Sequence, residues 1–319
     1  MSDTSSETFR APRITVVGSF AVGLTMRAPK LPIFGETMFG TDFDMGPGGK
    51  GSNQAVGAAR LGADAALVAI VGKDALANVG HDLWAGEGVD TSHIVVDETR
   101  PTGAGFIILN KAGENFILLD MGANEAAGPD LAQTAEARIA RSDIVMSVLE
   151  IPVAAAARAM ALGRQHGART ILNPAPATPI PSEMLPDIDY LTPNESELRI
   201  LLGLRPDDPR SSRELAGELR ARGVANVIVT LGGRGALVLN DDGETHVPAL
   251  AIDPIDTTGA GDAFNAGFAV ALGEGWDLLD AVRLGVACGG HACTALGVIP
   301  ALPRREAADT LLADMARAG

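Results

Sequence analysis

The segment Asp256-Thr-Thr-Gly-Ala-Gly-Asp262 places two carboxylates around small residues, directly before an apolar helical pattern. Small residues at the start of a helix leave backbone N–H groups uncovered, and these donors and the helix dipole together form an anion site. A phosphoryl group in transfer could bind there, and the carboxylate of Asp262 could accept the proton of an attacking hydroxyl. A carboxylate that only stabilises the start of the helix is the alternative interpretation.

A second glycine-rich stretch, GGKGSNQ at residues 48–54, also leads into a predicted helix. Its glycines allow a ligand to approach the backbone closely, while Lys50 and Asn53 offer donors that suit hydroxyls or phosphates. The stretch matches neither the Gly-Lys-Ser/Thr phosphate loop nor the dinucleotide fingerprint. A turn with a solvated lysine is the alternative.

Two more segments carry polar groups beside predicted elements. In TPNESE, residues 192–197, Pro and Asn precede a helix, and the spacing of Asn194 and Glu197 predicts an N-cap. In TLGGRG, residues 230–235, a strand is followed by a tight turn that could lie against a nucleotide. A plain hairpin turn without a ligand is the alternative.

These segments are connected by short β-branched runs that alternate with helical patterns. The strand-like runs are residues 14–18, 66–71, 144–148, 170–172, 227–230 and 236–239. The helical patterns include residues 53–61, 152–166, 195–202 and 212–222. This alternation favours a mainly parallel sheet with helices on both faces, which is a three-layer α/β sandwich.

Residues 37–44 and 103–119 break this rhythm, because strand-like runs follow one another there without a helix between them. The second stretch predicts a hairpin with its turn at residues 111–114. Such strands fit poorly into a parallel sheet, so we place them in a small β lid, which would exclude water from a transfer reaction. Exposed lid strands could also pair with a second copy, which predicts a homodimer.

The composition excludes several classes of partner. A formal charge of -15 opposes the backbone of a nucleic acid and an anionic membrane surface. The polar residues 1–13 lack the apolar run of a signal peptide, and no stretch reaches the roughly 18 apolar residues of a membrane helix, so we expect a cytoplasmic protein. The two cysteines, Cys288 and Cys293, lie in a predicted helix and are expected to be reduced core residues.

Taken in order, the four segments resemble the ribokinase-like (PfkB) carbohydrate kinase family over residues 14–303. Within that family the segments GGKGSNQA, PTGAGFIILNKAGENF, NPAPA, TPNE and TLGGRG look most like those of its ribokinase branch. The resemblance implies one kinase domain over residues 14–303 after the polar tail, built as an α/β sandwich with a β lid. It also implies ATP and a sugar as substrates.

The resemblance assigns roles to individual residues. Asp262 would be the general base on a primary hydroxyl of the sugar. The anion hole for the γ-phosphate would comprise Gly259, Ala260 and Gly261. The ATP site would be lined by Asn194, Thr230, Gly232, Gly235 and Gly261. The sugar hydroxyls would be held by Gly49, Lys50, Asn53, Glu150 and Asp262.

The resemblance further implies two metal ions. Glu197 would position Mg2+ through water. A potassium site built largely from backbone carbonyls would lie beside the anion hole, formed by Asp256, Thr258, Ala292, Ala295 and Gly297. Ribokinases typically add a serine to that site where this chain has Ala301, so K+ binding would be weaker or completed by water.

One departure from the family concerns the sugar. After the first strand ribokinases show Gly-Ser-x-Asn-x-Asp, whose Asn and Asp bind ribose hydroxyls, whereas Ala21 and Gly23 stand at those positions here. Each lost hydrogen bond of this kind costs roughly 1.5 to 3 kcal/mol. The vacated space could take a different sugar or a nucleoside base.

The leading hypothesis is therefore an ATP-dependent kinase for ribose or a related sugar, and the alternative within the family is a nucleoside or other carbohydrate kinase. A non-catalytic sugar or nucleotide sensor would be expected to have lost the anion hole or the base, and both are present in the sequence. A dinucleotide-dependent oxidoreductase is disfavoured because no Gly-x-Gly-x-x-Gly opens the first helix.

Overall fold

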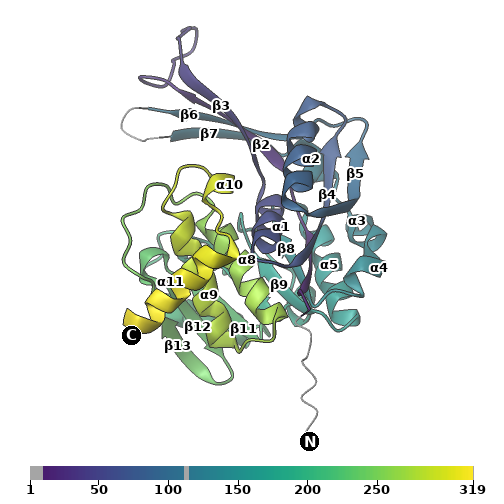
Figure 1. Cartoon of the computed structure of the whole chain (residues 1–319), viewed down its shortest axis with the longest axis vertical. Helices are drawn as coiled ribbons and strands as arrows, with labels where there is room; N and C mark the ends of the chain where they lie inside the picture. Colours follow the sequence, from purple (N-terminus) through teal and green to yellow (C-terminus); the bar gives the residue numbers. More distant parts are fainter. Residues whose placement is uncertain (1–9, 111–114, 319) are drawn as a thin grey trace, which may run out of the picture.

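A large β-sheet forms the centre of the protein. The computed structural model describes residues 10–110 and 115–318, and within them the main sheet has nine strands in the order β13-β12-β11-β10-β9-β8-β1-β4-β5 (Figure 1). They are β1 (Arg13–Val17), β4 (Asp64–Gly72), β5 (Asp90–Asp97), β8 (Ile144–Val148), β9 (Arg169–Asn173), β10 (Tyr190–Leu191), β11 (Asn226–Thr230), β12 (Ala236–Asn240) and β13 (Gly243–Val247). Seven neighbouring strands of this sheet pair in parallel: β11, β10, β9, β8, β1, β4 and β5. At one edge β12 pairs antiparallel with β11, and β13 pairs antiparallel with β12. The predicted mainly parallel sheet is therefore confirmed.

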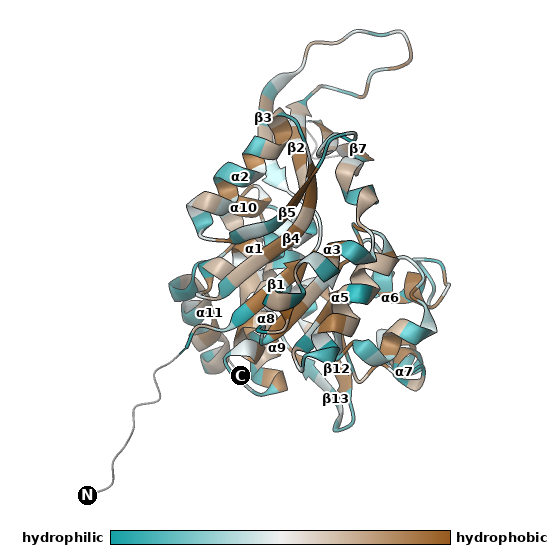
Figure 2. Ribbon diagram, turned by 90° about the vertical axis from the view of Figure 1, so that its right-hand side faces the viewer, coloured by the Kyte–Doolittle hydropathy of each residue, from teal (hydrophilic) through white to brown (hydrophobic). Residues whose placement is uncertain are grey.

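Helices cover both faces of this sheet because successive strand residues point to opposite sides. Val16 belongs to one buried cluster and Val17 to the other. The first cluster is covered by α1 (Lys50–Arg60), α2 (Ala75–Glu87), α8 (Ala260–Gly273), α9 (Leu278–Ala292), α10 (Val298–Ala301) and α11 (Arg305–Ala318). The second is covered by α3 (Pro129–Thr134), α4 (Glu136–Ile139), α5 (Val153–Gln165), α6 (Glu195–Leu201) and α7 (Ser212–Ala221). Figure 2 shows the brown, apolar strands enclosed between these helices.

The sequence placed the cores of six of the nine main-sheet strands well, missed β5, β10 and β13, and placed the beginnings of two helices late. Helix α1 begins at Lys50 rather than Asn53, so Lys50 belongs to the first helical turn and not to a loop. Helix α8 begins at Ala260 rather than Ala263, which places Asp262 in the first turn as predicted. Glycine lowers the helical signal of both starts, but packing against the rest of the fold overrides that weak preference.

The expectation for the cysteines is half right. Cys288 is fully buried in α9, and its burial raises the pKa of the thiol to about 12. Cys293 follows the last residue of α9 and is only partly buried. Both cysteines are free. Among the described residues, no helix has the length and apolar character needed to cross a membrane.

A second, four-stranded sheet projects from one end of the molecule as a lid (Figure 1). Its order is β3-β2-β6-β7, with β2 (Ala21–Arg27), β3 (Thr41–Gly48), β6 (Gly103–Leu109) and β7 (Asn115–Asp120). The predicted hairpin within residues 103–119 is confirmed, since β6 and β7 pair antiparallel; its turn at 111–114 lies outside the described residues.

The other lid boundary was wrong. Residues 37–40 form no strand, β3 instead runs to Gly48, and β2 was not predicted at all. Strand β2 carries Gly23 in its interior, and glycine weakens the sequence signal of a strand. Pairing with both β3 and β6 holds β2 in an extended conformation that its own residues do not predict.

Helices α1 and α8 pack closely enough to set the positions of the residues at their N-terminal ends. A Cβ added to Gly57 in α1 would lie 2.7 Å from the Cβ of Ala266 in α8, which is closer than two carbon atoms can approach. Any larger residue at position 57 must therefore push the two helices apart.

We predict opposite effects of one substitution at two helical glycines. Gly57→Ala should lower the free energy of unfolding by about 1 to 3 kcal/mol, because it overpacks the α1–α8 contact. Gly217→Ala, in α7, is the matched control: no atom lies within 4 Å of its added Cβ, so it should raise the free energy of unfolding by roughly 0.5 to 1 kcal/mol. Chemical denaturation measures both, and a neutral Gly57→Ala would contradict the close approach.

Candidate active site

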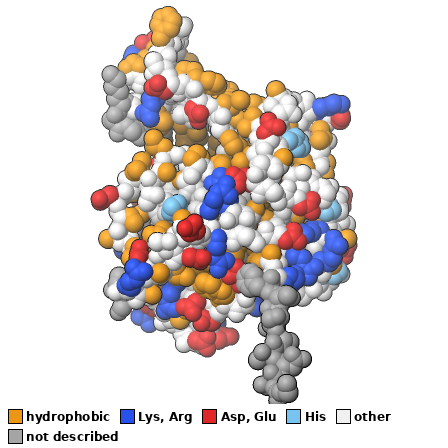
Figure 3. All heavy atoms as spheres, in the orientation of Figure 1, with side chains coloured by type: hydrophobic (Ala, Val, Ile, Leu, Met, Phe, Trp, Pro, Cys, Tyr) orange, Lys and Arg blue, Asp and Glu red, His pale blue; other side chains and the backbone are white. Residues whose placement is uncertain are grey.

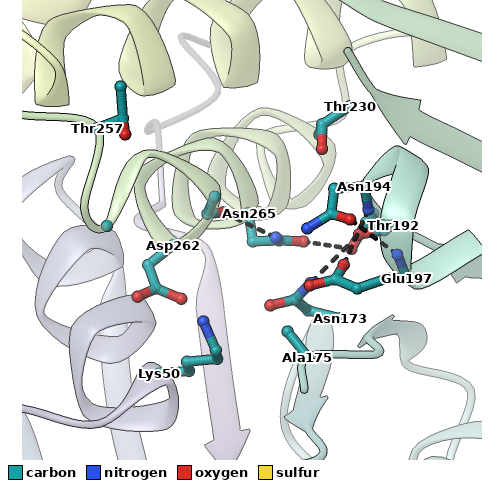
Figure 4. Close-up of a pocket in the computed structure, with 12 residues that line it drawn as sticks. Lys50, Asn173, Ala175, Thr192, Asn194, Glu197, Thr230, Thr257, Asp262 and Asn265 are labelled. Atoms are coloured by element: carbon teal, nitrogen blue, oxygen red, sulfur yellow. Dashed lines mark hydrogen bonds between the residues drawn. The ribbon is translucent and has the colours of Figure 1, made fainter. Parts of the chain in front are cut away.

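A pocket lies where the carboxyl ends of β9, β10 and β11 face the N-terminal ends of α1 and α8 (Figure 4). In open α/β sheets this edge is where ligands commonly bind. The residues that line it are Lys50, Asn173, Ala175, Thr192, Asn194, Glu197, Thr230, Thr257, Gly259, Gly261, Asp262 and Asn265. Seven of the residues singled out in the sequence therefore meet in one pocket, from four separate segments: Lys50, Asn194, Glu197, Thr230, Gly259, Gly261 and Asp262.

The N-terminal end of α8 has the form of an anion site. Gly259 caps the helix with a φ of 80°, a left-handed conformation that favours glycine, and an added Cβ would lie 2.5 Å from Val298 Cγ1. A Cβ added to Gly261 would meet nothing within 4 Å, so that side of the first turn is open. Backbone N–H groups and the helix dipole are thus accessible to an anion in the pocket.

The carboxylate of Asp262 is buried, with the residue only 4% exposed, and it is held by amide donors from α1. Asn53 Nδ2 donates to Asp262 Oδ2 over 2.8 Å. Gln54 Nε2 donates to Asp262 Oδ1 over 3.1 Å. Each oxygen of the carboxylate therefore has a donor, as a buried charge requires.

Lys50 provides a positive charge beside several carboxylates, and Figure 4 shows its amine directed toward Asp262. Burial alone would lower the pKa of Lys50, but the charges of Asp262, Glu150 and Glu197 raise it above its ordinary value. Burial raises the pKa of Glu150 and of Glu197, and in both cases the charge of Lys50 opposes that rise. A protonated Lys50 thus partly offsets a cluster of negative charge.

Glu150 does not line the pocket, and its contacts fix the loop that carries Lys50. Its Oε2 atom accepts hydrogen bonds from Ser19 Oγ over 2.5 Å and from the backbone N–H of Lys50 over 2.7 Å. Gly49 has a φ of 86°, and an added Cβ would lie 2.7 Å from Phe20 Cα, so the chain needs glycine there. Residues 19–20 and 49–50 are held together at the base of the lid.

On the opposite side of the pocket, α6 begins with the predicted cap. Glu197 N–H donates to Asn194 Oδ1 and Asn194 N–H donates to Glu197 Oε2, both over 2.8 Å, which is a capping box. An isolated parallel bridge pairs Asn194 with Thr230, which brings two of the expected nucleotide residues together. Gly232 and Gly235 lie farther out, in the turn of the β11–β12 hairpin, and do not line the pocket.

Three of the residues expected at the potassium site, Asp256, Thr258 and Gly297, are joined by hydrogen bonds, and all five expected residues lie outside the pocket. Asp256 Oδ2 accepts a hydrogen bond from the backbone N–H of Gly297 over 3.0 Å, while Oδ1 accepts from Thr258 N–H and Oγ1. These bonds lower the pKa of Asp256 although burial opposes them. The backbone N–H of Ile255 donates to the carbonyl of Cys293 over 2.8 Å, so the loop before α8 lies against the segment that follows α9, where Ala295 and Gly297 are found. Ala301 is buried in α10.

Sequence reasoning assigned no role to several residues at this edge. Asn173, Ala175, Thr192, Thr257 and Asn265 line the pocket, and Gln54 contacts Asp262 from behind it. A signal was available for some of them, because Asn173 ends β9 and Thr192 directly follows β10, where ligand-binding residues of parallel sheets gather. Gln54 offered no such signal, since its contact depends on how α1 packs against α8.

Comparison with known proteins agrees with this geometry. The sequence pattern described as "pfkB family carbohydrate kinase" matches residues 11–305. The chain belongs to the pfkB family. A ribokinase of Haemophilus influenzae is 36% identical over 92% of this chain and 96% of its own length, and a deoxyribokinase of Salmonella typhimurium is 33% identical over 92% and 96%.

Solved structures of pfkB-type kinases show the same fold. The structure of Arabidopsis thaliana ribokinase complexed with ribose and ATP superposes with a TM-score of 0.89 at 31% sequence identity, covering 95% of this chain and 99% of that one. The predicted sandwich with a separate lid sheet is thereby confirmed, and so is the family predicted from the four segments. As a pfkB member the chain is a carbohydrate kinase, that is, an enzyme that phosphorylates a sugar hydroxyl.

Proposed function

We propose that this kinase transfers the γ-phosphate of ATP to a primary hydroxyl of ribose or a related sugar, with Asp262 as general base. The observation that carries the proposal is the buried Asp262 carboxylate in the first turn of α8, beside the uncovered Gly261. A base and an anion site then face the same point of the pocket, as an in-line phosphoryl transfer requires. The names of the relatives, ribokinase and deoxyribokinase, support a pentose as acceptor.

The pocket divides into two sides in this proposal. Gly49, Lys50, Asn53 and Glu150 hold the sugar hydroxyls, and Asn53 Oδ1 is a buried acceptor without a hydrogen-bond partner among the described residues. Asn194, Thr230, Gly232 and Gly235 hold the nucleotide, and the N–H groups of Gly259, Ala260 and Gly261 receive the transferred phosphoryl group. Backbone donors of this kind stabilise charge that develops in the transition state.

Two ions complete the proposal. Three carboxylates and one lysine face the pocket region, so the phosphates of ATP would meet a net negative charge without a divalent cation. Glu197 keeps Oε1 outside its capping box and is the carboxylate we assign to Mg2+, through water. Carbonyls near Asp256, Thr258, Ala292, Ala295 and Gly297 suit K+, and activity assays without Mg2+, or with Na+ in place of K+, test the two assignments.

Asp262→Asn should abolish turnover and leave ATP binding near normal. Asparagine keeps the size of the side chain but cannot take the proton of the hydroxyl, and general-base catalysis is worth roughly 10²-fold or more. Turnover is measured by coupled release of ADP, and ATP binding by calorimetry. A variant that retains more than about a tenth of the wild-type rate would show that Asp262 is not the base.

A second candidate, a nucleoside or other carbohydrate kinase, is favoured by the shape of the lid. Ala21 in β2 pairs with Gly48 and Gly103, and Gly23 pairs with Gly46 and Gly105, so two rows of small residues cross three strands. Added Cβ atoms at Gly23, Gly46 and Gly48 would meet nothing closer than 3.5 Å. Neither crowding nor a positive φ demands glycine at these three positions, which leaves room for a bulkier or less polar group.

Ala21 and Gly23 lie on one face of β2, opposite to Val22 and Leu24. Val22 is fully buried and Leu24 packs against the core cluster, and alternate residues of a strand point to opposite faces. A Cβ added to Gly49 would lie 2.8 Å from the backbone nitrogen of Ala21, so Ala21 lies directly against the loop that carries Lys50. These two rows contain only alanine and glycine, so they offer no polar side chain that could form a hydrogen bond with a sugar hydroxyl.

A substrate panel decides between the two candidates. We expect a less polar or bulkier acceptor, such as 2-deoxyribose or a nucleoside, to exceed ribose in kcat/KM. In Gly23→Asp a new carboxylate could accept from ribose hydroxyls, so ribose should gain roughly 10-fold or more relative to 2-deoxyribose, as one charged hydrogen bond allows. Ala104, the next β6 residue after Gly103, provides a control as Ala104→Asp, since it points to the other face. A wild-type preference for ribose above all other acceptors would refute this interpretation of the lid.

We also propose that the lid joins two copies of the chain. Met45, Phe106 and Leu118 lie in one row across the lid strands and are 46%, 57% and 62% exposed. Figure 3 shows hydrophobic side chains gathered on the lid. Exposed apolar patches of this kind mark contact surfaces. Sedimentation at micromolar concentration should give twice the mass of the chain, and Phe106→Asp should restore the monomer. A monomeric wild type would remove the proposal.

A further inference from the structure

Gln54 is a completely buried side chain that contacts the carboxylate of Asp262. Its Nε2 atom donates to Asp262 Oδ1 over 3.1 Å and to Asn173 Oδ1 over 3.0 Å. An amide nitrogen carries two hydrogens, so both are used. Both donors are directed at protein acceptors and the side chain is completely buried, so Gln54 acts on Asp262 rather than on a substrate.

The hydrogen bonds continue from Asn173 back to the start of α8. Asn173 Nδ2 donates to Thr192 O over 3.2 Å, and Thr192 Oγ1 donates to Asn265 Oδ1 over 2.7 Å. Asn265 Nδ2 then donates to the carbonyl of Gly261 over 2.8 Å, one residue before Asp262. Figure 4 shows the dashed hydrogen bonds that join Asn173, Thr192 and Asn265 at the wall of the pocket. All of these side chains are at least nine-tenths buried.

The charge of Asp262 determines the direction of the bonds made by Gln54 and Asn173, while the carbonyl of Gly261 orients the amide of Asn265. An ionised carboxylate only accepts, so the Gln54 amide must present its nitrogen, and Asn173 must then present its oxygen to Gln54. Asn173 Nδ2 is consequently left for Thr192. The arrangement leaves Gln54 Oε1 buried without a partner among the described residues, which is uncommon for a buried acceptor. Turning the amide over would satisfy that oxygen no better and would place it against the carboxylate.

We propose that Gln54 is a positioning residue: through the ring of Gln54, Asn173, Thr192 and Asn265 it fixes the Asp262 carboxylate relative to the phosphoryl site of α8. The inference rests on the proposed role of Asp262 as base. Donors from Asn53 and Gln54 occupy one acceptor site on each oxygen, which leaves the remaining ones for the hydroxyl. Such second contacts matter because reacting groups must be held within about 0.5 Å of productive geometry.

Gln54→Met tests the proposal, because methionine keeps the length and burial of the side chain and removes the donor. We expect kcat to fall roughly 10- to 100-fold, as small misplacements of reacting groups do, while KM for ATP stays nearly unchanged. The acid limb of the pH profile of kcat should move to higher pH, since a carboxylate that loses a donor is easier to protonate. The charged groups that face Asp262, namely Lys50, Glu150 and Glu197, are untouched, so the shift reports the lost hydrogen bond.

Thr15→Val is the matched control, because Thr15 is equally buried and shares a 2.8 Å hydrogen bond with Ser142 away from the pocket. It should lose stability without any change in kcat or in the acid limb. Gln54→Met behaving like Thr15→Val would overturn the proposal. Should Gln54→Met fail to fold, Thr192→Val breaks the same ring without touching Asp262; it should lower kcat, and an unchanged kcat overturns the proposal.

The result is also distinguishable from a failure of the proposed function. If Asp262→Asn stays active, Asp262 is not the base and the role of Gln54 falls with it. If Asp262→Asn is inactive while Gln54→Met matches the wild type, the base stands and only the positioning role is wrong.

Discussion

The close contact of α1 with α8 is the constraint on which the site depends. Gly57 lies against Ala266 without room for a methyl group, and this contact brings the first turns of both helices to the same edge of the sheet. Asn53 and Gln54 can then reach Asp262 across helices that are about 200 residues apart in sequence. Gly57 allows the two helices to pack closely, and this packing sets the geometry of the Asp262 carboxylate, which Gly57 does not contact.

Burying that carboxylate is costly, and the structure meets the cost in three ways. Amide donors contact both oxygens, the start of α8 places the carboxylate at the positive end of a helix dipole, and Lys50 adds a full positive charge nearby. Glu150 and Glu197 add negative charge to the same region, where burial already raises their pKa. Lys50 is therefore required electrostatically whether or not it also contacts a substrate.

In the proposed function, the two sheets have different tasks: the main sheet positions the groups for phosphoryl transfer, and the lid contacts the acceptor. The main sheet delivers the pocket residues at the carboxyl ends of its strands, where parallel pairing brings distant segments to one edge. The lid contributes rows of small residues in β2, β3 and β6 instead of polar side chains. In the proposed function, the transfer chemistry therefore depends on the main sheet and the choice of acceptor on the lid.

The sequence by itself determined the cores of six main-sheet strands, the hairpin of β6 and β7, the cap at Asn194 and the place of Asp262 in the first turn of α8, because each depends on local chemistry or on short-range periodicity. Its motifs also carried the family, which the comparisons confirm. Tertiary structure alone decided that β2 is a strand, since only its two neighbours order it. It likewise decided the contact of Gln54 with Asp262, the ring through Asn173, Thr192 and Asn265, and the rows of small residues beside Gly23, because these arise from packing between segments that are far apart in sequence.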